Sequence, residues 1–162
     1  MYRLRVSTSI NAPITICFDL ARNVDAHIES AANTAERVVG GRTSGLLELD
    51  EEVTWEGKHF GAIQRFSSKI TQLRPYTFFQ DRMTKGAFRI FEHDHFFESE
   101  GNGTVMVDVV SFQAPFGPLG WLAERILLAP HLRHFLISRG LALKSMAERS
   151  RQGVVALPAD GE

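Results

Sequence analysis

Five runs of strand-forming residues follow one another through the middle of the chain with very little between them. The runs cover residues 52–60, 62–73, 76–84, 88–98 and 104–113. Turn-forming residues separate them, namely Gly61, Arg74-Pro75, Lys85-Gly86 and Gly101-Asn102-Gly103. Connections this short join antiparallel neighbours, because parallel strands need much longer crossovers. The sequence therefore predicts an antiparallel meander.

The segment before these runs predicts one strand and two short helices. Residues 2–10 alternate in polarity, as a strand does, and end at Asn11. Pro13 fits the first turn of a helix, so we expect a helix over residues 13–22 with Asn11 as its cap. We expect a second helix over residues 24–31, and then a strand near Arg37 between glycine-marked turns.

The pattern after the runs changes to the period of a helix. Residues 119–149 predict a long amphipathic helix, and Pro130 should kink or break it because proline lacks a backbone donor. With 162 residues the chain suits one core, so we expect a single domain over residues 1–150. Residues 151–162 carry few large side chains and are expected to form a disordered tail.

These elements predict an α+β fold in which a curved antiparallel sheet of about six to seven strands wraps around the C-terminal helix. An antiparallel sheet of this size must cover one face, and the last helix is the only large element left to do so. A gap remains where a curved sheet grips a helix. That gap is the expected ligand site.

Charge and composition exclude several classes of function. The chain has 18 basic and 19 acidic residues, so no basic field gathers phosphates and nucleic acid is not an expected partner. No apolar stretch approaches the ~20 residues that cross a bilayer, and no leader is evident, so we expect a cytoplasmic protein. The lone Cys17 excludes an internal disulfide and is expected to be a buried structural thiol.

The turn at Asn102-Gly103 predicts which side chains face the gap. A two-residue type I′ turn there pairs Gly101 with Thr104 and places His95 opposite Val110. One face then carries His93, His95, Phe97, Asp108, Val110 and Phe112. The other face carries Glu92, Asp94 and Glu98, three carboxylates that would be costly to bury. We therefore expect the first face inside, and the same alternation turns Trp55, His59, Asp81 and Met83 inward.

Several stretches of the chain resemble the START-like superfamily, also labelled SRPBCC, which includes the birch-pollen allergens. They are VTWEGKHFG (53–61), FFQDRMTKGAFRIFEHDHFFE (78–98), then Thr104, Met106 and Asp108, APFGPLG (114–120), and Arg139 in the last helix. The likeness covers about residues 2–148 and is greatest to the bacterial polyketide-cyclase-like or cell-division-inhibitor-like branch. It implies a helix-grip fold around a lipid, a polyketide or another aromatic or isoprenoid-like molecule. It also suggests that Arg139 reaches an interior carboxylate such as Asp108.

Three interpretations compete for the polar interior residues His59, Asp81, His93, His95 and Asp108. They form a satisfied structural network, they orient a ligand inside an apolar pocket, or they carry out chemistry. The chemical interpretation is acid–base catalysis by His95 or His93 with Asp108. Alternatively, His93 and His95 have the spacing of paired metal ligands, which His59 or Asp108 could complete.

The leading prediction is that the protein binds a small hydrophobic molecule between the sheet and the helix without turning it over. The alternative is a cyclase or dehydratase that uses His95, His93 and Asp108. The expected ligand-binding residues are Trp55, His59, Phe66, Asp81, Met83, His93, His95, Phe97, Met106, Asp108, Phe112, Trp121, Phe135 and Arg139. We expect no cofactor and no metal, and the sequence allows a homodimer.

Overall fold

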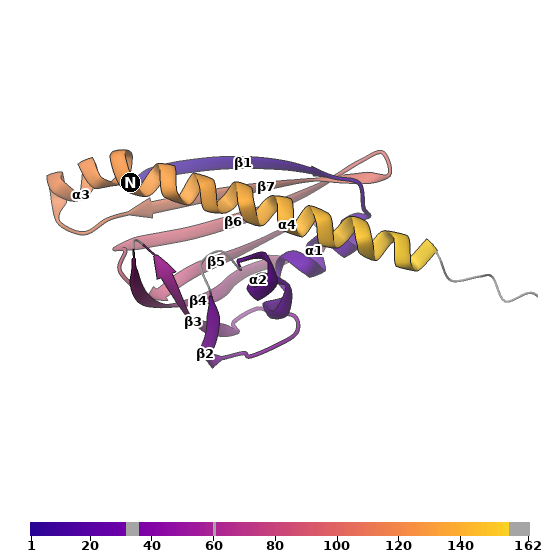
Figure 1. Ribbon diagram of the computed structural model, residues 1–162, viewed down its shortest axis with the longest axis horizontal. Helices are drawn as coiled ribbons and strands as arrows, with labels where there is room; N and C mark the ends of the chain where they lie inside the picture. The colour runs from indigo at the N-terminus through magenta and orange to yellow at the C-terminus, as the bar shows by residue number, and fades with distance from the viewer. Residues whose placement is uncertain (32–35, 60, 156–162) are drawn as a thin grey trace, which may run out of the picture.

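The computed structural model describes residues 1–31, 36–59 and 61–155, and it confirms the α+β class. Among these residues, seven strands form one antiparallel sheet in the order β1-β7-β6-β5-β4-β3-β2. The strands are β1 (Tyr2–Ile10), β2 (Arg37–Gly41), β3 (Glu52–His59), β4 (Ala62–Arg74), β5 (Phe78–Lys85), β6 (Ile90–Glu100) and β7 (Gly103–Gln113). The sheet curves around a long C-terminal helix, which is the helix-grip arrangement (Figure 1).

Strand pairing confirms the meander and explains the curvature. Each strand from β3 to β7 pairs with the next along the chain, and β1 closes the β7 edge. The register shifts once between β2 and β3, between Val38 and Gly40, and twice between β4 and β5. Such bulges bend a strand and increase its twist, so this end of the sheet curls toward the helix.

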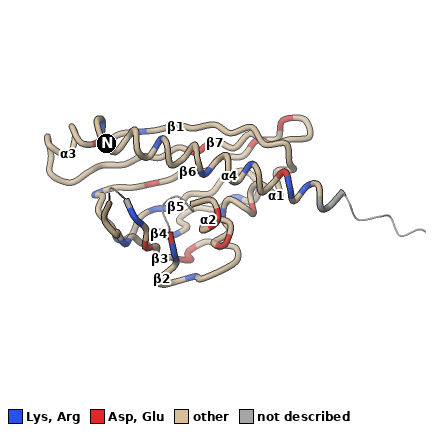
Figure 2. The backbone as a smooth tube through the Cα atoms, in the orientation of Figure 1, with Lys and Arg blue, Asp and Glu red and all other residues tan. Residues whose placement is uncertain are grey.

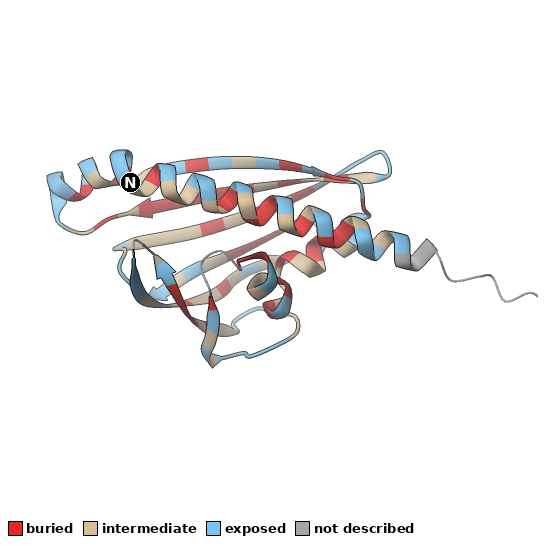
Figure 3. Ribbon diagram, in the orientation of Figure 1, coloured by how far each residue is buried: buried red, intermediate tan, exposed pale blue. Residues whose placement is uncertain are grey.

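The described helical segments lie over the concave face of the sheet, except the one over residues 117–123, which projects past the end of the sheet (Figure 1). They are α1 (Ile14–Ala21), α2 (Val24–Ser30), α3 (Gly117–Ala123), the π-helical η2 (Glu124–Leu128) and α4 (Ala129–Val155). Helix α4 runs the length of the sheet, and its buried residues form a stripe (Figure 3). A Cβ added at Gly140 would lie 2.6 Å from Thr8 Oγ1, so α4 and β1 are very close there.

The C-terminal helix differs from the prediction at both ends. Helical structure begins at Gly117, and the irregular part is the π-helical turn just before Pro130 rather than a break at the proline. Within that turn Glu124 is buried and accepts a hydrogen bond from the Ala114 N–H at 2.8 Å. A widened turn suits this position because Pro130 has no N–H to donate to the preceding helix.

The expected disordered tail is also partly wrong, because α4 continues to Val155. Arg151 donates to the Asn11 carbonyl oxygen at 3.0 Å, and this contact holds the last turns of α4 against the end of β1. Asn11 therefore binds α4 instead of capping α1, which begins after Pro13 with no side-chain cap. Residues 156–162 of the expected tail lie outside the described part of the chain.

The hairpin between β6 and β7 has a register two residues away from the predicted one. Glu100 pairs with Gly103, and Gly101 and Asn102 form the loop. Gly101 has φ 58, whereas Asn102 has no positive φ, so the turn is not type I′. Gly103 is the first residue of β7. Its lack of a side chain matters there, because a Cβ would lie 2.7 Å from the Ile10 carbonyl oxygen. A shift of two residues leaves every side chain on its predicted face.

The structure confirms the predicted faces of β6 and β7. His93, His95 and Asp108 are buried on the concave side. Glu98 is exposed on the convex side, where Glu92 pairs with Arg82 and Asp94 accepts a hydrogen bond from Gln80 at 2.7 Å. The convex side also holds Glu56, which faces outward as expected but is buried beneath Arg37 and Arg65.

Charged residues of both signs are interspersed along the described chain, with no long run of one sign (Figure 2). No helix among the described residues has the length and apolar character needed to cross a membrane. Cys17 is buried in α1, and its Sγ lies 3.7 Å from the Ala12 carbonyl oxygen.

Candidate functional site

A cavity of about 260 Å³ lies between the concave face of the sheet and α4. Strands β3 to β7 form one side of it, and α4 forms the other. Most of its lining is apolar, including Trp55, Phe66, Phe79, Met83, Phe88, Phe91, Leu132, Phe135 and Leu136. The cavity exists because α4 packs against β1 at one edge of the sheet, while the curled opposite edge stands away from it.

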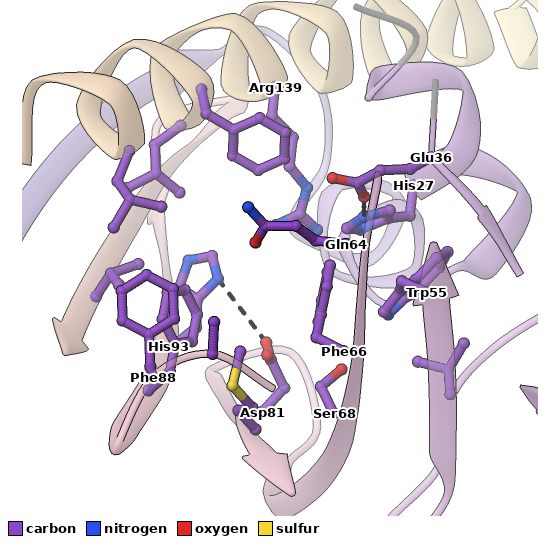
Figure 4. Close-up of a pocket in the computed structure, with 18 of the residues that line it drawn as sticks. His27, Glu36, Trp55, Gln64, Phe66, Ser68, Asp81, Phe88, His93 and Arg139 are labelled. Atoms are coloured by element: carbon purple, nitrogen blue, oxygen red, sulfur yellow. Dashed lines mark hydrogen bonds and ion pairs between the residues drawn. The ribbon is translucent and has the colours of Figure 1, made fainter. Parts of the chain in front are cut away.

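A few polar side chains interrupt this apolar lining (Figure 4). Asp81 and His93 come from β5 and β6, Gln64 and Ser68 from β4, and Arg139 enters from α4. His27 of α2 and Glu36 stand together at one end, with His27 Nε2 2.7 Å from Glu36 Oε2. An apolar pocket with a few placed polar groups is the usual form of a small-molecule site.

Two histidines and two aspartates form a cluster at the sheet side of the cavity. Asp81 and His93 line the cavity, and His95 and Asp108 are buried next to them. His93 Nε2 lies 2.9 Å from Asp108 Oδ1, and His95 Nε2 lies 3.0 Å from Asp81 Oδ2. His95 Nδ1 is also 2.9 Å from Asp108 Oδ1, but the angle is too poor for a hydrogen bond. His93 Nδ1 faces Asp81 Oδ2 at 3.8 Å. Each imidazole thus turns one nitrogen toward each carboxylate.

Neighbouring strands produce this cluster. Asp81 of β5 is directly opposite His93 of β6, and His95 is directly opposite Asp108 of β7. Because side chains alternate along a strand, His93 and His95 share one face with both partners. The His95 ring also stacks on Phe79, with centroids 4.1 Å apart, which fixes its plane.

The pKa values of the two histidines are shifted in opposite directions. Burial lowers the pKa of His95, but the carboxylates of Asp108 and Asp81 more than offset it, so that the pKa is raised. Burial and the neighbouring His95 lower the pKa of His93 despite its bond to Asp108. Burial opposes ionisation of both carboxyls, yet their histidine contacts hold the pKa of Asp108, and of Asp81, below the usual range. Of the two histidines, His95 is therefore the one that holds a proton more readily.

Arg139 is buried and lines the cavity with an incomplete set of hydrogen bonds. Its Nη2 donates to the Ala21 carbonyl oxygen at 3.1 Å, but its Nε has no hydrogen-bond partner among the described residues. The expectation that Arg139 pairs with Asp108 is wrong, because α4 carries Arg139 across the cavity from β7. Burial and the charge of Arg139 together lower the pKa of His27.

The predicted ligand-binding residues fall into three groups. Those that line the cavity are Trp55, Phe66, Asp81, Met83, His93, Phe135 and Arg139. Those that are buried but are not among its described lining residues are His95, Phe97, Met106, Asp108 and Phe112. Trp121 is 52% exposed on α3, where Arg125 stacks over its ring, so it does not close the cavity. The side chain of His59 lies outside the described part of the chain.

Sequence reasoning missed several polar residues of the cavity. Gln64 and Ser68 share the alternation of Phe66 along β4, so the pattern that placed Phe66 inward also predicts them. His27 belongs to α2, and Glu36 directly precedes β2. Strand alternation does not predict which way side chains point in either segment. His131, next to Pro130 on α4, also lines the cavity.

No protein-family model matches the sequence, and no curated protein matches it. Solved structures do match. TTHA0849 from Thermus thermophilus is 18% identical over 92% of this chain and 99% of its own, with a TM-score of 0.75. The Zhui aromatase/cyclase from Streptomyces sp. R1128 is 13% identical over 91% of this chain and 94% of its own, with a TM-score of 0.70. Ara h 8.0201 is 12% identical over 90% and 97%, with a TM-score of 0.66.

These likenesses confirm the fold that the sequence resemblance implied. The chain has the helix-grip fold, and the matched structures cover nearly its whole described length. At identities this low the likeness concerns the fold alone, so function must be argued from the site.

The buried Asp108 predicts a specific loss of stability in acid. An Asp whose folded pKa is depressed stabilises the fold above its unfolded pKa of about 3.9. This contribution is lost as the pH falls from that value toward the lower pKa of the folded state. Asp108→Asn should cost about 3 kcal/mol near neutral pH, because it leaves the histidines without their anion. The difference from wild type should shrink below about pH 4. Urea unfolding across this range measures it.

Asp94→Asn, on the convex face of the neighbouring strand, is the matched control for Asp108→Asn. It should follow the wild-type pH dependence. A wild-type advantage over Asp108→Asn that stays constant into acid would contradict the ionised state of Asp108.

Proposed function

We propose that this protein binds one small apolar molecule, of one or two aromatic rings and with at least one oxygen acceptor, in the cavity between the sheet and α4. The observation that carries the proposal is the cavity itself, with its apolar lining and its few buried polar groups. The fold is one that an aromatase/cyclase also uses, which supports an aromatic occupant without specifying its chemistry.

The volume of the cavity limits the size of the ligand. An engineered apolar cavity of about 150 Å³ accepts benzene, whereas drug-sized ligands need about 300 Å³ or more. A cavity of about 260 Å³ lies between these values, so one or two rings fill it. Aromatic side chains such as Phe66 and Phe88 provide flat surfaces against which such rings pack.

The polar side of the cavity provides the preference for oxygen. Arg139 Nε is a buried donor without a described partner, and leaving such a donor unpaired is costly. A carbonyl or phenolic oxygen placed there would accept that bond. Water would have to be displaced from the site, so the gain depends on the ligand reproducing the bond that water makes.

A larger side chain at Ser68 should weaken ligand binding, because it would fill part of the cavity. Ser68 lines the cavity from β4 (Figure 4). Ser68→Phe adds a ring where the ligand ring would lie, so the affinity for acetophenone should fall at least tenfold by calorimetry, which is about 1.4 kcal/mol. Ser99→Phe, at an exposed position of β6, is the matched control and should bind as wild type does. Equal binding by Ser68→Phe and wild type would place the ligand elsewhere.

Arg139 should make the protein prefer a ketone to a hydrocarbon of the same shape. Acetophenone and ethylbenzene differ by one carbonyl oxygen, and a hydrogen bond to a charged group contributes about 1.5–3 kcal/mol. Wild type should therefore bind acetophenone about tenfold more tightly after correction for solubility. Arg139→Met should remove this preference while retaining ethylbenzene. A thermal melt checks that the variant folds, and an unchanged preference in folded Arg139→Met would exclude the bond.

A second candidate function is acid–base catalysis on a carbonyl compound, of the cyclase or dehydratase type. One observation favours it: His93 lines the cavity, and its Nε2 is bonded to Asp108. Such a pair can accept a proton from the carbon next to a carbonyl, with Asp108 stabilising the imidazolium. The candidate narrows to His93, because His95 does not line the described cavity.

Catalysis by His93 predicts deuterium exchange at the methyl group of bound acetophenone in heavy water, followed by NMR. A positioned general base contributes about 100-fold or more, so His93→Gln should reduce the exchange rate by at least this factor. His134→Gln, at an exposed position of α4, should exchange as wild type does. Exchange by wild type that is no faster than by His93→Gln would leave binding as the function.

A further inference from the structure

We propose that Asp81, His93 and His95 bind one divalent transition-metal ion at the sheet side of the cavity, with Asp108 orienting the two imidazoles. This metal site differs from the expectation of no metal. It does not depend on the identity of the apolar ligand, because all four residues belong to the sheet.

The donor atoms of the metal site already converge. Asp81 Oδ2, a ring nitrogen of His93 and a ring nitrogen of His95 all lie within 4.8 Å of one another. Two of these contacts are short, at 3.0 Å from Asp81 Oδ2 to His95 Nε2 and 3.8 Å from Asp81 Oδ2 to His93 Nδ1. The three residues come from two adjacent strands, so the backbone holds them in place.

The distances suit an ion of the size of zinc. Metal–ligand bonds of about 2.0–2.2 Å at the tetrahedral angle place two donors about 3.3–3.6 Å apart. The contact between Asp81 and His95, at 3.0 Å, is shorter than this spacing, and the contact between Asp81 and His93, at 3.8 Å, is longer, so Asp81 must move away from His95 and toward His93. Asp81 is the ligand that can move, because its side chain keeps 22% of its surface exposed, whereas His95 keeps 1%.

Asp108 occupies the position of an outer-shell carboxylate. Its Oδ1 is 2.9 Å from His93 Nε2 and 2.9 Å from His95 Nδ1, so both imidazoles direct their other nitrogen toward Asp81. Histidines that bind metals almost always have such a partner on the second nitrogen, which fixes the tautomer and the ring orientation. Asp108 is bonded in this way to His93, and it faces His95 Nδ1 at 2.9 Å without a hydrogen bond.

Charge balance also favours a divalent ion. The cluster places one buried and one partly buried carboxylate against two imidazoles. The hydrogen bond between Asp81 and His95 requires a proton between the two groups. An ion with two positive charges replaces that proton and balances both carboxylates. Two nitrogen donors and one oxygen suit transition metals such as Zn²⁺, Co²⁺ or Fe²⁺, whereas Mg²⁺ and Ca²⁺ prefer oxygen alone.

Asp81 and His93 line the cavity, so the remaining coordination positions face it. Three protein ligands with open positions are the arrangement that metal sites use to bind a water molecule or a substrate oxygen. The oxygen of a ligand in the cavity would then meet the metal on the sheet side or Arg139 on the helix side.

The test is titration of the untagged, chelator-treated full chain with Co²⁺, followed by its visible absorption, with no apolar ligand added. Wild type should take up one Co²⁺ per chain, and Zn²⁺ should displace it. Asp81→Asn and His95→Gln should weaken binding by at least tenfold. Asp108→Asn should weaken it by about 10–100-fold, as loss of an outer-shell partner does. His134→Gln, which alters an exposed histidine of α4, should bind as wild type does.

A thermal melt of each variant separates loss of metal from loss of fold. If His95→Gln does not fold, the partly exposed Asp81→Asn carries the test. No stoichiometric Co²⁺ uptake by folded wild type, or equal uptake by wild type and folded Asp81→Asn, would overturn the metal site. Neither result bears on ethylbenzene binding, so failure of the metal site and failure of the cavity proposal are distinguishable.

Discussion

The close contact between α4 and β1 is the constraint on which the rest of the structure depends. A glycine at position 140 lets the helix approach Thr8 at one edge of the sheet, and Asn11 fastens its C-terminal turns through Glu148 and Arg151. A helix held along one edge cannot also fill the concave side of a sheet whose opposite edge stands away from it. The cavity follows from this mismatch, and the aromatic residues of β3 to β6 reduce it to the size of a small ligand.

The interior tolerates the polar cluster because each carboxylate lies against both imidazoles. Isolated charges buried to this depth would cost several kcal/mol each. Here Asp81 and Asp108 each face both histidines, so no carboxylate is left without an opposing group. This arrangement alone suffices to explain a structural network. Its position beside an apolar cavity, with Arg139 opposite and only partly bonded, is what suggests binding and chemistry.

Most of the fold could be predicted from the sequence, because alternation along strands is a local property. It assigned His93, His95 and Asp108 to the inside even though the hairpin register was two residues off, since an even shift preserves the faces. The sequence could not distinguish residues that line the cavity from those behind it, such as His95 and Phe112. That distinction depends on how strongly the sheet curls and how far α4 stands away, which are set by bulges and packing across the whole molecule. For the same reason the position of Trp121, which precedes the π-helical turn, could not be predicted.

The two sides of the cavity come from parts of the chain that are far apart in sequence and bear different kinds of residue. The sheet contributes the His and Asp cluster, which is rigid because its members constrain one another across β5, β6 and β7. The helix contributes mainly apolar lining residues, including Leu132, Phe135 and Leu136. Substitutions at these apolar positions of α4 can therefore change the shape and size of the cavity without replacing a member of the polar cluster. In evolutionary terms, the shape of the cavity and the composition of the cluster can change independently.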